Sequence, residues 1–267
     1  MSNNPILSNV YVPVSSPGKA MPRKKAGNEN GRTHQSLRQA HFTTDCFSNA
    51  NGSSLVELGH TKAVCMVFGP HSVDGAGGDF HSDGRLNCVV SMPLSPSDQN
   101  NRQARATLTS DEAELSLNLK DAVSSSLLNL EKYSKSVIDV RVKLLQDDGG
   151  ALVASIIAAS LALADAGIEC LDLVTACHAC VMPGDPETYG HDREMCLLDP
   201  TKEELNAALG TVTVALMPNM KEVTYWDQSG RLTSSSSSTA ISLCRDGTGA
   251  MNKLMRSCLT MSNPDSS

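Results

Sequence analysis

The sequence predicts an α/β fold of two halves, with mixed sheets and long amphipathic helices. Paired β-rich segments fill residues 52–70, and a strictly alternating run spans 138–144. Two long helical patterns, at 109–130 and 151–166, lie between such strands. Strands and helices that alternate along a chain are typical of α/β folds. The 267 residues suffice for one domain of roughly 220 residues or two smaller lobes, with a tail.

The first element is a predicted hairpin over residues 52–70. Its two β-rich halves flank Gly59 and His60 and end at Gly69 and Pro70. The glycine-rich stretch 71–85 is a predicted loop, 86–92 a short apolar strand, and 95–106 a second loop.

The central elements are a helix, a strand and a second helix. Thr109 and Glu112 have the spacing of a capping box, which predicts that a helix starts there. One face of that helix carries Leu115, Leu119, Val123, Leu127 and Leu130. Residues 138–144 alternate apolar and polar, as in a strand with one buried face. Residues 151–166 are small or apolar on all sides, which predicts a helix sandwiched between layers.

Strands are predicted at 171–182, 211–217 and 222–226, with turns at 218–221 and 227–230. A last amphipathic helix follows, with residues 234–238 as its first turn. Its buried positions are spaced by three and four: Ala240, Cys244, Gly247, Met251, Leu254 and Cys258.

The predicted domain organisation is a disordered basic tail at 1–36, one domain at 37–262 and a short C-terminal tail at 263–267. The first 40 residues hold six Lys or Arg against Glu29 alone. The remainder holds 16 basic and 28 acidic side chains, a net charge of −12. An acidic body neutralises few phosphates, so extensive RNA binding by this chain alone is disfavoured.

The sequence contains no apolar run of about 20 residues and no secretory leader, which predicts a cytosolic or nuclear protein. Nine cysteines stand scattered among apolar neighbours, which predicts reduced and mostly buried thiols. Cys177, His178 and Cys180 invite a zinc hypothesis, but no second pair follows at ligand spacing. Buried strand residues are the preferred interpretation, and no metal site is expected.

Three stretches resemble the RNase PH family, whose members trim or degrade RNA from the 3′ end by phosphorolysis or serve as inert ring subunits. They are GSSLVELGHTKAVCMVFGP at 52–70, DDGGALVASIIAASLALADAGIECLDLVTACHACVMPG at 147–184, and LLDPTKEELNAALGTVTVALMP at 197–218. The third resembles the exosome branch and is most similar to ring subunits of the messenger-RNA-transport-regulator type. The resemblance covers about residues 38–261 and implies an RNase PH-like fold.

The resemblance also implies which positions would carry chemistry. In active members a Ser/Thr-Arg-Thr triplet after the Asp-Gly-Gly turn holds the attacking phosphate at a helix start. Two acidic residues, six positions apart, act beside the scissile linkage. The matching positions here are Ala151, Leu152, Val153, Leu205 and Thr211. We therefore expect no catalytic residue and no cofactor, and we predict that the chain is not an enzyme.

Two further sets of side chains offer alternatives. Glu203 and Glu204 could replace the lost carboxylates only if the loop shifted register, and a solvated loop face is expected instead. Arg102 and Arg105 remain from the family's arginine-rich RNA path. They are weak RNA-binding candidates, since two exposed arginines in a polar loop are more often only solvated.

The resulting hypothesis is a non-catalytic structural subunit of an RNA exosome ring, which scaffolds the RNA-threading channel. Implied partners are other RNase PH-like subunits in a hexameric ring, S1 or KH cap subunits, and RNA in the pore, with no membrane. The implied location is the nucleus and nucleolus, and also the cytoplasm. The main alternative is a phosphorolytic 3′-to-5′ exoribonuclease whose site is shared with a neighbouring subunit. A free-standing RNA-binding module conflicts with the acidic body and the 3% aromatic content.

Overall fold

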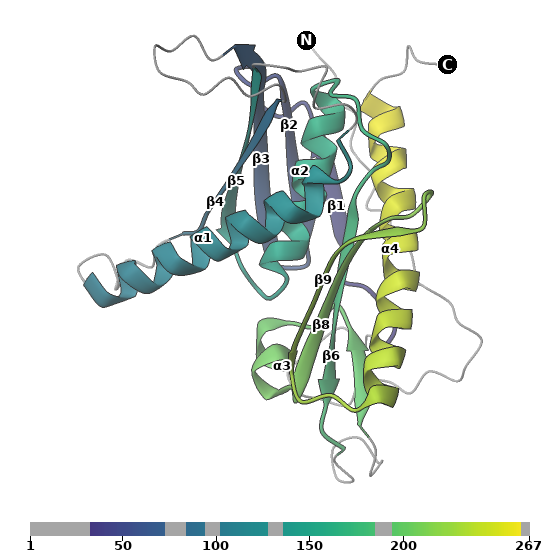
Figure 1. The fold of residues 1–267 in the computed structure, drawn as a ribbon. Coiled ribbons are helices and arrows are strands. Elements are labelled where there is room, and N and C mark those ends of the chain that lie inside the picture. Colours follow the sequence, from purple (N-terminus) through teal and green to yellow (C-terminus); the bar gives the residue numbers. More distant parts are fainter. Residues whose placement is uncertain (1–32, 73–83, 94–101, 128–135, 185–193, 263–267) are drawn as a thin grey trace, which may run out of the picture.

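Two β-sheets and three long helices form the molecule in a computed structural model (Figure 1). The structure describes residues 33–72, 84–93, 102–127, 136–184 and 194–262. The strands of each sheet come from one half of the chain, and a central helix lies between the halves. The predicted α/β class with two halves is confirmed.

The first sheet has the strand order β1-β2-β3-β5-β4 and is mixed. Its strands are β1 (Ala40–Thr44), β2 (Gly52–Leu58), β3 (Thr61–Ser72), β4 (Arg85–Ser91) and β5 (Ser136–Gln146). β4 runs parallel to β5, and the other pairs are antiparallel. The predicted hairpin is confirmed as β2 and β3, with Gly59 at a φ of 58° in its turn. Glycine adopts this left-handed conformation without the steric cost of a side chain.

The second sheet has the order β7-β6-β8-β9 and is antiparallel throughout. Its strands are β6 (Thr175–Met182), β7 (Met195–Leu198), β8 (Gly210–Met217) and β9 (Glu222–Gly230). Every residue of β6 is buried, because helices cover both faces of this sheet. The turn predicted at 227–230 is wrong: these residues pair with 210–213 of β8, so β9 continues to Gly230.

The helix α2 (Ala151–Asp165) lies between the two sheets and contacts strands of both (Figure 1). Residues 153–163 are all buried, which confirms the predicted sandwiched helix. It approaches β2 closely at Gly52, where a Cβ atom would lie 2.3 Å from the carbonyl oxygen of Ala162. Small residues of α2, such as Ala162, allow this approach to β2.

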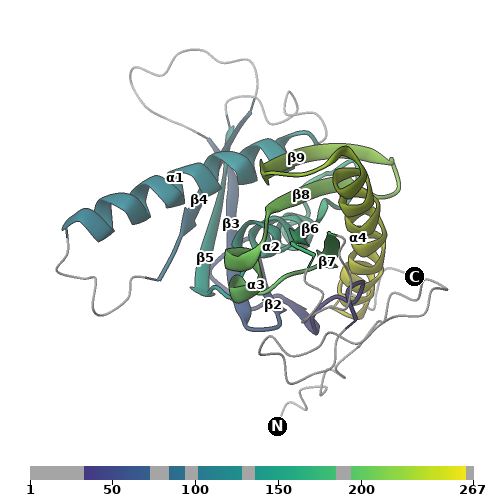
Figure 2. The same cartoon turned by 90° about the horizontal axis from the view of Figure 1, so that it is seen from below.

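Two more long helices pack beside the sheets (Figure 2). α4 (Ser234–Ser262) packs on the side of the second sheet opposite α2, and α1 (Arg102–Ser124) runs from beyond β4 to β9. The capping box predicted at Thr109 is wrong, because α1 begins seven residues earlier, at Arg102. Glu112 binds elsewhere: its carboxylate accepts a hydrogen bond of 2.7 Å from the backbone N–H of Met92.

None of the nine cysteines, all within the described residues, forms a disulfide. Five are buried and four are half-buried. Within the described ranges, the helices are too short or too polar for any of them to span a bilayer.

Candidate functional site

The turn that joins β5 to α2, residues 147–150, is the centre of a buried polar network. Gly149 and Gly150 have φ values of 80° and 86°, which L side chains rarely adopt. The carboxylate of Asp147 accepts a hydrogen bond of 3.1 Å from the N–H of Gly149. Gly150 is the N-cap of α2 and has no side chain with which to cap the helix. The first turn of α2 therefore begins with backbone N–H groups alone.

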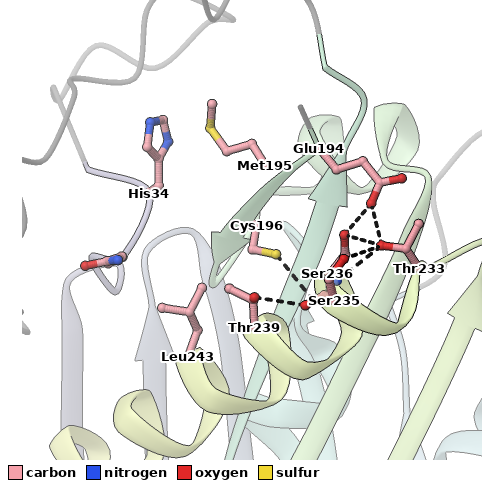
Figure 3. Close-up of a pocket in the computed structure, with 10 residues that line it drawn as sticks. His34, Glu194, Met195, Cys196, Thr233, Ser235, Ser236, Thr239 and Leu243 are labelled. Carbon is pink, nitrogen blue, oxygen red and sulfur yellow. Dashed lines mark hydrogen bonds between the residues drawn. The ribbon is translucent and has the colours of Figure 1, made fainter. Parts of the chain in front are cut away.

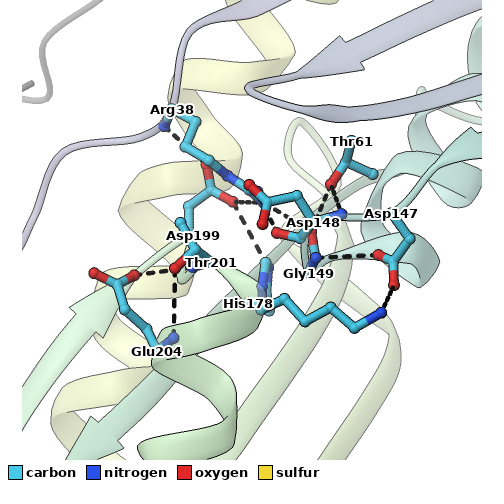
Figure 4. A network of polar contacts seen from close by, with 10 residues as sticks. Arg38, Thr61, Asp147, Asp148, Gly149, His178, Asp199, Thr201 and Glu204 are labelled. Atoms are coloured by element: carbon cyan, nitrogen blue, oxygen red, sulfur yellow. Dashed lines mark hydrogen bonds and ion pairs between the residues drawn. The ribbon is translucent and has the colours of Figure 1, made fainter. Parts of the chain in front are cut away.

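Arg38 holds this turn from one side (Figure 4). Its guanidinium donates to the carbonyl oxygens of Asp148 (2.8 Å) and Gly149 (2.9 Å). Thr61 holds it from the other side: its hydroxyl donates to the carbonyl of Gly149 at 2.8 Å and accepts from the N–H of Asp148 at 3.0 Å. The backbone before α2 is thus fixed by groups from two other segments.

Asp199 balances the charge of Arg38. One carboxylate oxygen accepts from the guanidinium at 2.7 Å, and the other accepts from the backbone N–H of Arg38 at 2.8 Å. Only 5% of the Arg38 side chain and 3% of the Asp199 side chain are exposed. Burial alone would raise the pKa of Asp199, but the charge and hydrogen bonds of Arg38 outweigh it and lower that pKa to about 2. Both groups are therefore ionised at neutral pH.

His178 of β6 lies beside this pair without joining its hydrogen bonds. Neither ring nitrogen has a hydrogen-bond partner among the described residues, and Nδ1 is 3.9 Å from the Asp199 carboxylate. Burial lowers the pKa of His178 to about 4, so the ring is neutral at pH 7. The ring also lies against the start of α2, since a Cβ atom at Gly150 would lie 2.8 Å from His178 Cε1.

A short helix, α3 (Lys202–Ala207), closes the other side of the turn. It begins with a capping box: Thr201 accepts from the N–H of Glu204, and the Glu204 carboxylate accepts from the N–H of Thr201 at 2.9 Å. Glu203 is exposed, as predicted for a solvated face. The same prediction is wrong for Glu204, which is buried because its carboxylate caps α3. Glu204 cannot act as a replacement carboxylate without breaking that cap.

The structure brings together some of the positions that the resemblance singled out. Ala151, Leu152 and Val153 form the start of α2, and none of them has a side-chain hydrogen-bond donor. Leu205 of α3 reaches the same place, since its Cδ1 lies 3.0 Å from a Cβ built at Gly149. The rest of its side chain packs against an apolar cluster of Cys180, Met182 and Leu197.

The other predicted positions lie on β8 and α1. Thr211 is on β8, opposite Cys180 of β6 and Ser229 of β9. Arg102 and Arg105 lie at the start of α1, and their side chains are outside the described part of the structure. Their contact with RNA stays a prediction.

The zinc hypothesis does not match the geometry of β6. Cys177 packs in the main core, where it contacts Cys244 of α4, while Cys180 belongs to the separate cluster beside Leu205. Within the described ranges, no three His, Cys, Asp or Glu side chains converge as metal ligands.

A separate hollow of about 660 Å³ lies at the start of α4 (Figure 3). Both polar and apolar groups line it: His34, Gln35, Glu194, Met195, Cys196, Thr233, Ser235, Ser236, Thr239 and Leu243. The Glu194 carboxylate accepts hydrogen bonds from the hydroxyls of Ser236 and of Thr233 (3.1 Å). The start of α4 favours a negative charge, and the Glu194 carboxylate already occupies that position. The hollow therefore does not suit a phosphate group.

Sequence reasoning missed Arg38, Thr61 and Asp199, which make the network, and it named His178 only as a buried strand residue. Arg38 and Asp199 are 161 positions apart, and each stands among other polar residues of its own segment, so neither is conspicuous in the sequence. Only the Asp-Gly-Gly run gave a local signal, because consecutive glycines before an apolar helix indicate a special turn.

Comparisons with known proteins agree on one family. The model of the RNase PH family, described as "3′ exoribonuclease family, domain 1", matches residues 36–169. Exosome complex component Rrp41 of Cenarchaeum symbiosum is 32% identical over 231 residues, which cover 86% of this chain and 89% of that protein. Exosome complex component MTR3 of Mus musculus is 33% identical over 233 residues, or 84% of this chain and 82% of that protein.

Solved structures show the same fold. Rice Rrp46 matches with a TM-score of 0.68 at 20% identity, over 86% of this chain and 98% of that one. A chain of the Archaeoglobus fulgidus exosome with RNA bound to the active site matches with a TM-score of 0.67 at 19% identity, over 84% and 91%.

The prediction that the chain is not an enzyme is contradicted by these comparisons. The matching family model describes 3′ exoribonucleases, and the similar relatives include Rrp41 components of archaeal origin. The prediction rested on five side chains. In an assembly, groups from a neighbouring chain can complete a site, so the loss of side chains in one chain does not establish the absence of activity.

Proposed function

The chain belongs to the RNase PH family of 3′ exoribonucleases, and we propose that it is a ring subunit of an RNA exosome. The resemblance predicted from three motifs is confirmed. In this proposal the chain supports 3′-to-5′ RNA processing and degradation by scaffolding the channel through which RNA is threaded. The observation that carries the proposal is its similarity, over more than four fifths of its length, to exosome components from archaea and mouse.

The buried network supports a scaffolding role. Arg38, Thr61 and Asp199 fix the turn before α2, although Ala151, Leu152 and Val153 offer no side-chain donor there. These hydrogen bonds therefore keep the backbone of the turn 147–150 in a fixed conformation. We propose that the partners are other RNase PH-like subunits in a six-membered ring, S1 or KH cap subunits, and RNA in the pore beside Arg102 and Arg105. The proposed location is the nucleus, with the nucleolus, and the cytoplasm.

The test is isolation of the native assembly. A tagged copy of the full chain, expressed from its own promoter, is expected to copurify with several other RNase PH-like subunits in fixed proportion. Depletion of the chain is expected to lengthen the 3′ ends of ribosomal RNA precursors. Imaging of the same tagged copy reports its location. Recovery of the chain without any RNase PH-like partner would contradict the proposal.

Two observations favour a second function: the family is one of 3′ exoribonucleases, and the start of α2 has no side-chain cap. The chain would then contribute to a phosphorolytic site completed by a neighbour. Inorganic phosphate would attack the terminal phosphodiester, releasing a nucleoside diphosphate and leaving RNA one residue shorter with a 3′ hydroxyl. The backbone N–H groups after Gly150 face no side-chain cap of their own, and a helix start favours an anion.

This second function is tested in a ring reconstituted from full-length subunits. Leu152→Glu places a negative charge at the start of α2 and is expected to reduce phosphate-dependent diphosphate release at least tenfold, whereas Leu152→Met is expected to leave it unchanged. A wild-type ring that releases no diphosphate, or a Leu152→Glu ring with full activity, would contradict it.

A further inference from the structure

The first sheet has an outer face, the side of β3, β4 and β5 that points away from α1 and α2. Along β4 and the second half of β5, exposed residues alternate with buried ones. The buried residues, such as Val90 and Val140, belong to the core that these strands share with the two helices. The free edge of β4 lies against α1, because the hydroxyl of Ser116 accepts a hydrogen bond of 2.8 Å from the N–H of Val90. The described helices therefore leave the outer face accessible, but not that edge.

The outer face is basic. Four cationic side chains point outward from its strands: Lys62, Arg85, Arg141 and Lys143. Two carboxylates share the face: Glu57 of β2 pairs with Lys62 at 2.8 Å, and Asp139 of β5 lies 3.8 Å from Arg141. Four positive and two negative charges leave a net charge of +2, whereas the chain beyond residue 40 carries −12 in total. A basic surface on an acidic body attracts acidic partners to one place.

Exposed apolar side chains flank two of the cations. Val89 of β4, which is 46% exposed, lies opposite Arg141 of β5. Lys143 and Leu145 follow Arg141 at every second residue of β5, and Leu145 is 48% exposed. Side chains two positions apart on a strand lie about 6.6 Å apart on the same face. A second extended segment has that same spacing, so acidic residues two positions apart reach Arg141 and Lys143 together.

Two observations favour a protein segment over RNA on this face. Binding of single-stranded RNA relies on aromatic rings that stack on its bases, but the guanidinium of Arg141 lies over the Phe68 ring, 5.3 Å from its centroid. The carboxylate of Asp139 also repels phosphates. Val89 and Leu145, in contrast, are stabilised when apolar side chains cover them, and a protein segment can supply those side chains.

We propose that the outer face of β4 and β5 is a docking surface for an acidic extended segment of a protein partner. Two acidic residues of the segment pair with Arg141 and Lys143, and its apolar residues cover Val89 and Leu145. The inference goes beyond the proposed function, because it concerns recruitment of a further protein and not assembly of the ring.

The probe is a fluorescein-labelled synthetic peptide in which two glutamates, two positions apart, stand between two leucines. Fluorescence anisotropy measures its binding to the full-length chain, alone and in a ring reconstituted from full-length subunits. The same peptide with lysines in place of the glutamates is expected to bind at least tenfold more weakly. Arg141→Glu and Lys143→Glu are each expected to weaken binding of the glutamate peptide at least tenfold. The matched control, Lys253→Glu, is expected to leave binding unchanged, because Lys253 is exposed on α4, which packs on the second sheet.

The outcomes separate this docking surface from the proposed function. A wild-type chain that binds both peptides equally, or neither, overturns the docking surface, and this comparison needs no variant. Single-stranded oligouridylate that displaces the peptide and binds more tightly would assign the face to RNA and also overturn the inference. Loss of peptide binding on ring assembly would show that ring neighbours cover this face, which overturns the inference and leaves the proposed function standing. A chain that binds the peptide but joins no ring overturns the proposed function alone.

Discussion

At the scale of single residues, the decisive feature is an ion pair that almost no solvent reaches. Arg38 and Asp199 share two hydrogen bonds. The Arg38 guanidinium also donates to two carbonyl oxygens of the turn before α2 and so fixes that turn. A second pair, Arg256 with Asp172, has the same distance of 2.7 Å, but 46% of its arginine side chain is exposed. Both carboxylates are buried and the two N–O distances are equal, so the pairs compare a buried arginine with a half-exposed one.

Arg38→Met is expected to lower the free energy of unfolding by about 3–5 kcal/mol, because it leaves the Asp199 carboxylate buried without its cation. Arg256→Met is expected to cost about 1 kcal/mol or less, since water reaches that arginine and Asn219 still donates to Asp172. Urea unfolding at pH 7 measures both values. Equal losses in the two variants would show that burial of the Arg38 pair has no special effect.

His178 makes stability depend on pH. Its pKa is about 4 in the folded chain and near its ordinary value of about 6.5 in the unfolded chain. The unfolded chain therefore binds an extra proton between these values, so stability is full above about pH 6.5 and falls as the pH drops toward 4. The loss is at most about 3 kcal/mol.

The measurement is urea unfolding of the wild-type chain and of His178→Met at intervals from pH 7 to pH 4. Other groups, including the Asp199 carboxylate, titrate in both proteins, so the difference between the two curves isolates His178. The wild-type chain is expected to lose more stability than the variant across this range. Parallel curves would mean that the imidazole titrates alike in both states.

At the scale of elements, the packing of α2 depends on how closely its backbone approaches β2 as well as on its apolar side chains. The run of small and apolar residues at 151–166 predicted α2 almost to the residue. The strands β1 and β7 and the helix α3 were not predicted, because they are four to six residues long and too short for a period to appear. Their pairing partners, rather than their own sequences, determine them.

Gly52→Ala is expected to destabilise the chain by about 3 kcal/mol, since the new Cβ would meet backbone atoms of Ala162 and Ala166 at 2.3 Å. The control is Gly249→Ala in α4, where a Cβ meets nothing within 4 Å. That change is expected to stabilise the chain by about 0.5–1 kcal/mol, because alanine favours the helix. Thermal unfolding gives the sign of each effect. A tolerated Gly52→Ala would mean that α2 can shift away from β2.

At the scale of the whole molecule, the question is where the folded body begins. The domain was predicted to begin at residue 37, after a tail at 1–36. The structure places residues 33–36 against the body: the N–H of Leu198 donates to the carbonyl of His34 at 2.8 Å, and Ser36 is buried. Residues 1–32 and 263–267 lie outside the described residues, so the two tails remain proposals.

Limited proteolysis is expected to cut the chain after basic residues 19–32 and to stop there, because cleavage needs backbone that can leave the body. Mass spectrometry of trypsin-treated chain identifies the stable fragment, and its unfolding transition is expected to match that of the intact chain. Protection of Arg23, Lys24 or Lys25 in the isolated chain would contradict the predicted tail.

The sequence by itself determined the class of fold, the central hairpin and the long helices, because hydrophobic period and turn residues are local properties. It also determined the family, since three separated motifs stand in the same order as in its members. Five motif positions, Ala151, Leu152, Val153, Leu205 and Thr211, could be named from the sequence alone.

Only the tertiary structure decided which groups surround those positions. Arg38, Thr61, His178 and Asp199 come from four segments, and each is an ordinary polar residue in its local context. The exposure of Trp226 was likewise undetermined, because exposure depends on which strands stand at an edge. Thr201 and Glu204 do have the local spacing of a capping box, but so do Thr109 and Glu112, and only the structure shows which pair caps a helix. Burial and long-range pairing are properties of the folded chain, and no local pattern encodes them.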